Sequence, residues 1–187
     1  NKIARKFKIK LIEDAAEAFG SFKKNKHAGL FSEIGALSFN GNKIITTGSG
    51  GAIITNNHLL EKKIRHISST SKIKHPFKFI HDQIGFNYRM NNLGSALGVS
   101  QLKRIRQTLM LKKNLNIFYQ NYFKNSDEFS IFDYKNDQLK MNYWLNLILF
   151  NKSSSNFIDN LISELLKQKI YLRRLWNPLH RSEEHTS

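Results

Sequence analysis

Short apolar segments with the character of β-strands alternate along this chain with longer segments whose apolar residues recur at helical spacing. Strands are expected at residues 8–12 (just before Glu13-Asp14), 34–40, 52–55, 142–150 and 171–176. Helices are expected at 15–19, at 58–68, after Asn91 in a long segment that can extend through Phe123 with a break, and at 157–169. Because the two kinds of element alternate, the sequence predicts an α/β layered fold.

Local signals set the ends of several elements. Asn40 and Gly41 form a strong turn signal that ends the second strand, and the glycines between 48 and 51 make a tight connection to the third. Asn91 is a good N-cap for the long helix, and serines 153–155 cap the last helix. Residues 69–82, which include Pro76, are expected to form a loop. The buried stripe of the long helix is expected to consist of Leu93, Leu97, Leu102, Ile105 and Leu109.

The composition indicates a folded protein and excludes several kinds of site. Hydrophobic residues make up 40% of the 187 residues, which is enough for a core, and there is no cysteine. Disulfides, thiolate catalysis and cysteine-based zinc sites are therefore excluded, and a reducing cytoplasm is the expected location. No apolar run approaches the roughly 20 residues of a membrane helix, and the first ten residues are not expected to be a secretory signal peptide. The seven histidines show no metal-ligand spacing, so no metal is expected.

The formal charge of +16, from 30 Lys+Arg against 14 Asp+Glu, could attract nucleic acid, anionic membranes or phosphorylated metabolites. The lysines are spread along the chain, without an RNA-binding aromatic motif or an arginine-rich arm. We therefore attribute the charge to biased composition and expect neither a nucleic-acid partner nor a membrane partner.

Three short segments carry residues suited to chemistry. Residues 13–21 read Glu-Asp-Ala-Ala-Glu-Ala-Phe-Gly-Ser, residues 38–43 read Ser-Phe-Asn-Gly-Asn-Lys, and residues 81–90 read His-Asp-Gln-Ile-Gly-Phe-Asn-Tyr-Arg-Met. In this order and spacing they resemble the sugar aminotransferases of the DegT/DnrJ/EryC1/StrS family. The resemblance runs from about residue 8 to residue 109 and resumes weakly at residues 176–180, Trp-Asn-Pro-Leu-His.

The resemblance implies an aspartate-aminotransferase-like fold, that of fold type I pyridoxal-phosphate enzymes. Residues 1–124 would be the C-terminal part of the cofactor-binding large domain with its long connecting helix, and residues 125–180 part of the small α/β domain. Residues 181–187 look like a foreign tail. We expect the chain to cover only the middle of a family member, and to be inactive or poorly folded by itself.

The resemblance also implies a cofactor, pyridoxal 5′-phosphate, and two residues central to its chemistry. Lys43 would hold it through a Schiff base and, once released, move a proton as a free base. Asp14, at the end of a strand, would pair with the pyridine nitrogen and keep it protonated. Taken alone, Lys43 is an ordinary surface lysine of a basic protein, and Asp14 an aspartate bonded to backbone amides at a helix start.

Further residues follow from the resemblance. Glu17 would contact the cofactor ring or its hydroxyl, and the Ser38 hydroxyl would bind the phosphate. Asn87 would reach across a homodimer interface to the partner's phosphate, so that the site is shared between subunits. Arg89 and His180 are candidates for substrate contact. Without the resemblance, Ser38 is a strand serine bonded to backbone and Arg89 forms a surface ion pair.

The implied reaction is transamination of a nucleotide-linked 4-keto-6-deoxy sugar, with glutamate as amino donor, for surface glycan biosynthesis. Two other functions are considered. Some relatives with this fold are sugar dehydratases that carry histidine in place of the lysine, and Lys43 argues against that function. A basic nucleic-acid-binding or regulatory module is the alternative from a different class, and it leaves the three ordered motifs unexplained.

Overall fold

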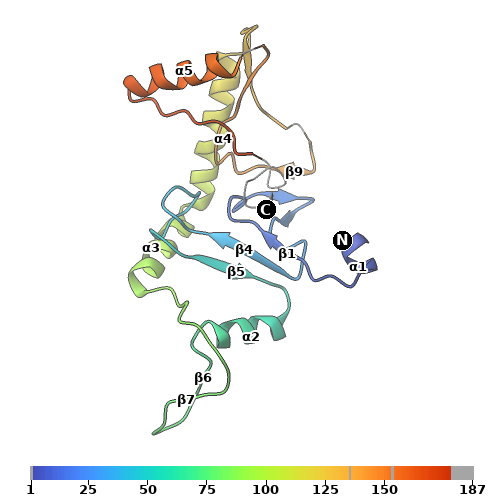
Figure 1. Ribbon diagram of the computed structural model, residues 1–187, viewed down its shortest axis with the longest axis vertical. Helices are drawn as coiled ribbons and strands as arrows, with labels where there is room; N and C mark the ends of the chain where they lie inside the picture. The colour runs from blue at the N-terminus through green and yellow to red at the C-terminus, as the bar shows by residue number, and fades with distance from the viewer. Residues whose placement is uncertain (1, 135, 153, 178–187) are drawn as a thin grey trace.

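The computed structural model describes residues 2–134, 136–152 and 154–177. At its centre is a sheet of three strands in the order β1 (Ile12–Asp14), β4 (Ile34–Ser38), β5 (Gly51–Ile54) (Figure 1). β1 runs parallel to β4, with Asp14 opposite Ala36, and β5 runs antiparallel to β4, with Gly51 opposite Ser38. The ends of β1 and β4 therefore lie at the same edge of the sheet.

One of the smaller sheets joins residues from both halves of the chain, and a second consists of residues from the C-terminal half alone. Their strands are β2 (Phe22–Lys23), β3 (Lys26–His27) and β9 (Leu139–Lys140) in one sheet, and β8 (Phe129–Ile131) and β10 (Ile148–Phe150) in the other. Because β9 pairs with β2, a segment from the C-terminal part of the chain is hydrogen-bonded to the loop region that follows β1.

Helices α1 (Lys2–Lys6), α2 (His58–Ile67), α3 (Asn92–Lys103), α4 (Ile105–Tyr122) and α5 (Ser155–Lys167) complete the fold. The predicted caps are confirmed: Asn91 accepts a hydrogen bond from the Gly94 amide, and Ser154 accepts one from the Phe157 amide. The long helix runs to Tyr122 with a break, as expected, and the structure places the break at Arg104. Local capping and periodicity were enough to place α2, the α3–α4 segment and α5 within two residues of their ends, whereas α1 was not predicted.

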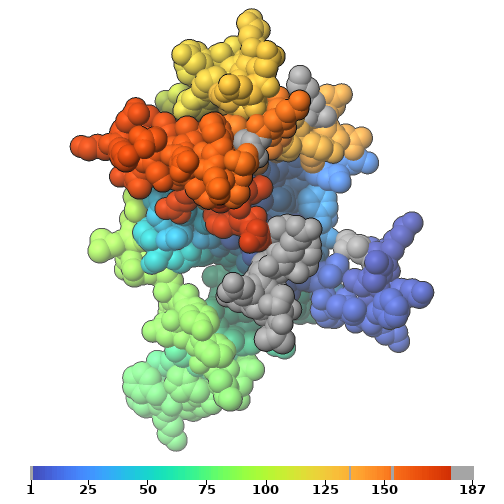
Figure 2. All heavy atoms as spheres, turned by 45° about the horizontal axis from the view of Figure 1, so that its top comes forward, coloured from blue at the N-terminus to red at the C-terminus, as the bar shows by residue number. Residues whose placement is uncertain are grey.

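Residues 69–82 differ from the prediction of a plain loop, because they contain the hairpin of β6 (Lys72–Ile73) and β7 (Ile80–His81). The hairpin projects from the body of the molecule, and both Figure 1 and the green surface of Figure 2 show it as a separate protrusion. Phe77 and Phe79 near its tip are 90% and 82% exposed. Two large apolar side chains are thus held out in solvent.

The first predicted strand is wrong in position, and the first predicted helix does not form. Residues 8–11 are not a strand. Lys8 has a φ of +54°, and Ile12 is the first residue of this segment that pairs with β4. Residues 15–19 form turns instead of a helix, because the Ala15 amide donates to the Ala36 carbonyl and so continues the sheet. Too few residues then remain before Gly20, at φ +84°, for a helix to form.

Three further expectations for the C-terminal half and the long helix are corrected. The strand expected at 142–150 shortens to β10, and residues 171–176 are not a strand. The leucine stripe of the long helix is largely exposed, with Leu93 85% accessible. The side of α3 that packs against the chain is made of Gly94 and Gly98, which lie close to Thr47, so the leucines turn outward.

The two faces of the central sheet differ in how they are covered. Gly35 and Leu37 of β4 are buried on one face. On the other face Ile12 and Ile53 are 71% and 53% exposed. Side chains of paired residues, and of residues two apart, point to the same face, so Asp14, Ala36 and Ser38 share this open face.

Candidate active site

Lys43 lies in a turn that directly follows β4. The Asn40 side chain accepts a hydrogen bond from the Gly41 amide, and the Lys43 amide donates to the Asn40 carbonyl at 3.1 Å. The next two residues, Ile44 and Ile45, are buried and anchor the turn. The expected Asn-Gly turn therefore places the lysine at the edge where β1 and β4 end.

A side chain from α3 secures the far side of this turn. Gln101 accepts a hydrogen bond from the Thr46 amide at 3.0 Å and donates one to the Thr46 carbonyl at 2.8 Å. The two bonds saturate a backbone unit that no strand pairs, so the helix fixes the position of the loop. Hydrogen bonds therefore hold the backbone on both sides of Lys43.

The Lys43 side chain is only 13% exposed, which is unusual for a lysine. Its Nζ lies 3.1 Å from Oε1 of Glu17 and 4.3 Å from the centre of the Trp144 ring. A long cationic side chain is stable in such a place because a carboxylate and the face of an aromatic ring replace water. The structure therefore brings together two of the residues selected from the sequence, Lys43 and Glu17.

Asp14 and Ser38 lie on the open face of the sheet at the same edge. Oδ1 of Asp14 accepts a hydrogen bond from the Ala16 amide at 3.0 Å, and the Ser38 hydroxyl accepts one from the Asn40 amide at 3.3 Å. Each side chain thus also stabilises the turn that follows its strand, through a hydrogen bond to a backbone amide. An amine, two carboxylates and a hydroxyl are gathered around the ends of β1 and β4, which is a donor set that fits pyridoxal phosphate.

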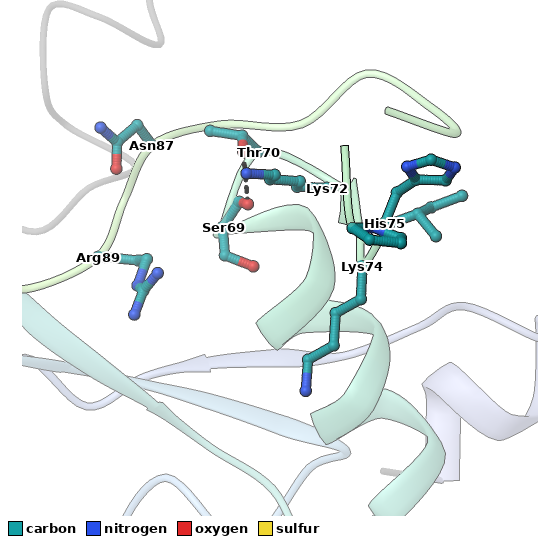
Figure 3. Close-up of a pocket in the computed structure, with 9 residues that line it drawn as sticks. Ser69, Thr70, Lys72, Lys74, His75, Asn87 and Arg89 are labelled. Carbon is teal, nitrogen blue, oxygen red and sulfur yellow. Dashed lines mark hydrogen bonds between the residues drawn. The ribbon is translucent and has the colours of Figure 1, made fainter. Parts of the chain in front are cut away.

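Asn87 and Arg89 lie elsewhere, beside the projecting hairpin. They line a cavity of about 700 Å³ together with Ser69, Thr70, Lys72, Ile73, Lys74, His75 and Pro76 (Figure 3). This cavity does not include Lys43, Asp14 or Glu17. Arg89 also borders a second cavity of about 750 Å³ that includes Ser38, so it lies between the hairpin and the sheet edge. The last predicted contact residue, His180, falls outside the described residues.

Sequence reasoning missed three residues that shape the site. The Glu13 carboxylate accepts hydrogen bonds from the amides of Gly29, Phe31 and Ser32, and so fixes the loop beside β1. Asn142 and Trp144, expected in a strand, instead contact the Glu17 and Lys43 turns. Adjacency to Asp14 could have drawn attention to Glu13, but no local signal links residue 144 to residue 43.

A model of the DegT/DnrJ/EryC1/StrS aminotransferase family matches residues 1–186 of the chain. The chain belongs to this family. GDP-perosamine synthase of Escherichia coli O157:H7 is 33% identical over 96% of this chain and 48% of its own length. The UDP-4-amino-4,6-dideoxy-N-acetyl-beta-L-altrosamine transaminase of Campylobacter jejuni strain 81-176 is 32% identical over 80% of this chain and 40% of its own length.

A solved structure supports the DegT/DnrJ/EryC1/StrS assignment. Helicobacter pylori PseC, an aminotransferase involved in the biosynthesis of pseudoaminic acid, superimposes with a TM-score of 0.84 at 27% identity, covering 98% of this chain and 50% of PseC. The aminotransferase fold predicted from the sequence is thereby confirmed, and the chain spans about half the length of these family members. The division into two domains at residue 124 stays a prediction, and the tail at 181–187 lies outside the described residues.

No helix of residues 2–134, 136–152 and 154–177 is long and apolar enough to cross a membrane. Across the same ranges, no three histidine or carboxylate side chains form a group that could hold a metal ion.

Proposed function

We propose that the protein carrying this chain transfers an amino group from an amino acid, with glutamate as the donor, to a nucleotide-linked 4-keto-6-deoxy sugar for surface glycan synthesis, using pyridoxal 5′-phosphate. Family membership supports the aminotransferase class. The names of two relatives, GDP-perosamine synthase and a UDP-amino-sugar transaminase, support a nucleotide sugar as substrate. The absence of cysteine agrees with the cytoplasm as the place of action.

The observation that carries the proposal is the placement of the Lys43 amine. It is shielded from solvent at the strand edge, next to one carboxylate and beneath an aromatic ring. A lysine that must act as a nucleophile has to leave bulk water and be held in a fixed direction. Most lysines of this basic chain are exposed, and Lys10, which is 82% exposed in its pair with Glu33, represents them.

The side chains around Lys43 suggest distinct roles. When bound, pyridoxal phosphate supplies an aldehyde for covalent attachment and a ring that withdraws electrons from the reacting carbon. Lys43 would attach the cofactor and, once released, carry the proton of the substrate carbon that bears the nitrogen. Asp14 would hold the ring nitrogen, Ser38 the phosphate, and Glu17 the ring hydroxyl or the released ammonium of Lys43.

We also propose that the active form is a homodimer in which the hairpin region completes the partner's site. Asn87 lines a cavity that does not include Lys43 in the same chain. The neighbouring hairpin presents Phe77 and Phe79 to solvent. The exposed apolar hairpin and the neighbouring Asn87, which is separated from Lys43 of its own chain, are what we expect of a site shared between two copies. Arg89 would then contact the substrate.

Borohydride reduction tests the central proposal. The intact protein is loaded with pyridoxal phosphate, reduced, digested and analysed by mass spectrometry for the lysine that carries the pyridoxyl group. The adduct is expected on Lys43 in the wild type, to be absent in Lys43→Ala, and to be unchanged in the surface control Lys10→Ala. An adduct on a different lysine, or none, would falsify the assignment of Lys43.

A further inference from the structure

The indole of Trp144 forms a wall of the Lys43 site, and no catalytic role has been assigned to it above. Its ring centre lies 4.3 Å from Nζ of Lys43, and its Nε1 donates a hydrogen bond to the carbonyl of the adjacent Asn42 at 2.6 Å. Trp144 also stacks on Trp176, with ring centres 6.0 Å apart and planes at 18°. One side chain thus contacts both the backbone and the ammonium of the lysine turn.

The segment that carries Trp144 is firmly attached to the region after β1. Asn142 is buried, and its Nδ2 donates to the carbonyls of Glu17 at 2.7 Å and Phe19 at 3.1 Å. Its backbone amide donates to the Ser21 hydroxyl, while its Oδ1 accepts from the Trp144 amide at 3.0 Å. Each polar group of this buried side chain is therefore satisfied, which makes the attachment specific.

The backbone between these two residues is shaped for the attachment. Tyr143 has a φ of +51°, a left-handed conformation that a large aromatic side chain rarely adopts. Lys112 of α4 donates to the Trp144 carbonyl at 3.2 Å and holds the segment from its other side. Such a conformation persists where its surroundings determine it, here the bonds of Asn142 and Trp144.

We infer that Trp144 is a positioning residue for Lys43, and this inference rests on the proposed function. Glu17 connects Lys43 with the segment of Trp144, because its carboxylate accepts a hydrogen bond from Lys43 and its backbone carbonyl accepts one from Asn142. The aromatic face attracts the ammonium and the carboxylate fixes its direction, so the lysine amine is kept pointing into the site whenever it is not covalently linked. Residues 142–144, from the C-terminal half of the chain, thereby set the orientation of a side chain about a hundred residues upstream.

The matched variants are Trp144→Phe and Trp144→Leu in the intact protein freed of cofactor. Both lose the indole N–H bond to Asn42, but only phenylalanine keeps an aromatic face for the Lys43 ammonium. Two rates are measured by mass spectrometry: attachment of pyridoxal phosphate at Lys43, trapped by borohydride at timed intervals, and acetylation of Lys43 relative to the exposed Lys10. The second rate requires no cofactor, so it tests the Lys43–Trp144 contact even if the cofactor is found on another lysine.

In Trp144→Leu, attachment is expected to slow and acetylation to rise, each by about 3- to 10-fold, because a cation–π contact worth roughly 1 kcal/mol is lost. In Trp144→Phe both rates are expected to stay within about twofold of wild type. General loosening of the fold would accelerate both labelling and attachment, whereas loss of orientation moves them in opposite directions. Equal values for the two variants in either measurement overturn the inference.

Fluorescence supplies a test that leaves Trp144 in place. These 187 residues contain two tryptophans, so Trp144 becomes the sole reporter when Trp176→Phe is combined with replacement of any tryptophan that the intact protein carries outside them. Replacing Lys43 by methionine in that background is expected to shift or intensify the Trp144 emission, since the cation over its ring is removed. The matched control Lys10→Met should leave the emission unchanged. If the Trp144 emission were the same with and without Lys43, the two side chains would not be in contact, which also overturns the inference.

Discussion

Lys43 and Glu17 form an ion pair of 3.1 Å in which the lysine side chain is 13% exposed and the carboxylate 47% exposed. Solvent reaches the carboxylate side, so the pair adds little to the stability of the fold, about 1 kcal/mol or less. Its main consequence is the direction in which it holds the amine. Stability and reactivity should therefore respond differently when the pair is broken.

Glu17→Ala is expected to slow attachment of pyridoxal phosphate to Lys43 by about tenfold, because a charge-assisted hydrogen bond that orients the amine is lost. Glu17→Gln keeps an oxygen acceptor and should retain most of the rate. The measurement is the growth of visible absorbance after the cofactor is added to the cofactor-free intact protein. Glu33→Ala, which breaks the exposed pair with Lys10, is the control and should have no effect. Equal rates for Glu17→Ala and the wild type would contradict the role of Glu17.

Asp14 offers a way to separate a structural role from a role at the cofactor. Its Oδ1 accepts the Ala16 amide hydrogen, a bond that asparagine can also make. Asp14→Asn should therefore fold and still bind pyridoxal phosphate, but lose about 10²-fold or more in transamination, since a neutral amide cannot hold the ring nitrogen protonated. Thermal unfolding, the adduct at Lys43 and turnover are measured on one sample. Normal turnover in Asp14→Asn would assign Asp14 to the turn alone.

Gly35 of β4 tests the packing beneath the open face of the sheet. A Cβ at this position would lie 2.1 Å from the carbonyl oxygen of Gly29, whose backbone is held by Glu13. Gly35→Ala is expected to destabilise the fold by about 2–4 kcal/mol, because neither backbone can move aside without breaking hydrogen bonds. Gly41→Ala is the matched control, since nothing lies within 4 Å of its Cβ position. Denaturant unfolding of the intact protein should show a lower midpoint for the first variant only.

The sequence allowed prediction of the helices, strands and turns that are set by caps, turn residues and apolar periodicity within the element. Helix α2 starts beyond the Asn57 cap and ends within one residue of the expected position, and a break in the long helix was expected, although its place at Arg104 was not predicted. The strand β4 and the turn before Lys43 follow from alternation and an Asn-Gly pair. In each case the sequence signal that allows the prediction lies within the element itself or in the residues next to it.

The remaining parts depend on contacts that no local pattern encodes. The segment 15–19 has helix-forming residues, but the Ala15 amide is taken by Ala36 of β4. Residues 142–145 have strand-like composition, but Asn142 bonds to the carbonyls of Glu17 and Phe19. Motif resemblance selected Lys43 and Glu17, which the structure places together, whereas their contact with Trp144 required the tertiary fold.

The ion pair of Asp159 and Arg174 predicts a dependence on pH in the C-terminal region. The Arg174 guanidinium, 2.8 Å away and hydrogen-bonded, lowers the pKa of Asp159, against a smaller opposing effect of desolvation. A carboxyl group whose pKa is lower in the folded state contributes stability above its unfolded pKa and loses it as the pH falls through the folded pKa. The attachment of residues 171–177 to α5 should therefore weaken on acidification below about pH 4.

This pH dependence can be checked by following the Asp159 carboxyl carbon by NMR. Arg174→Gln removes the largest cause of the shift and should bring the Asp159 pKa back toward its ordinary value. The pair of Lys167 with Glu164 in α5 serves as a control that Arg174→Gln leaves intact. If the titration of Asp159 were the same in both proteins, the pair would not persist in solution.

The shared site is testable by mixing two inactive variants. Lys43→Ala removes the attachment point, and Asn87→Ala removes the side chain proposed to cross to the partner copy. If the two residues act in one site from different subunits, a mixed dimer contains one site with both Lys43 and Asn87 and one site with neither. Random exchange of subunits in equal amounts should then restore roughly a quarter of the wild-type activity. Should both residues act within one subunit, every site of the mixed dimer lacks one of them and the mixture stays inactive. A Lys43→Ala sample mixed with a Lys43→Ala/Asn87→Ala sample controls for exchange itself, because no combination of these subunits supplies the lysine.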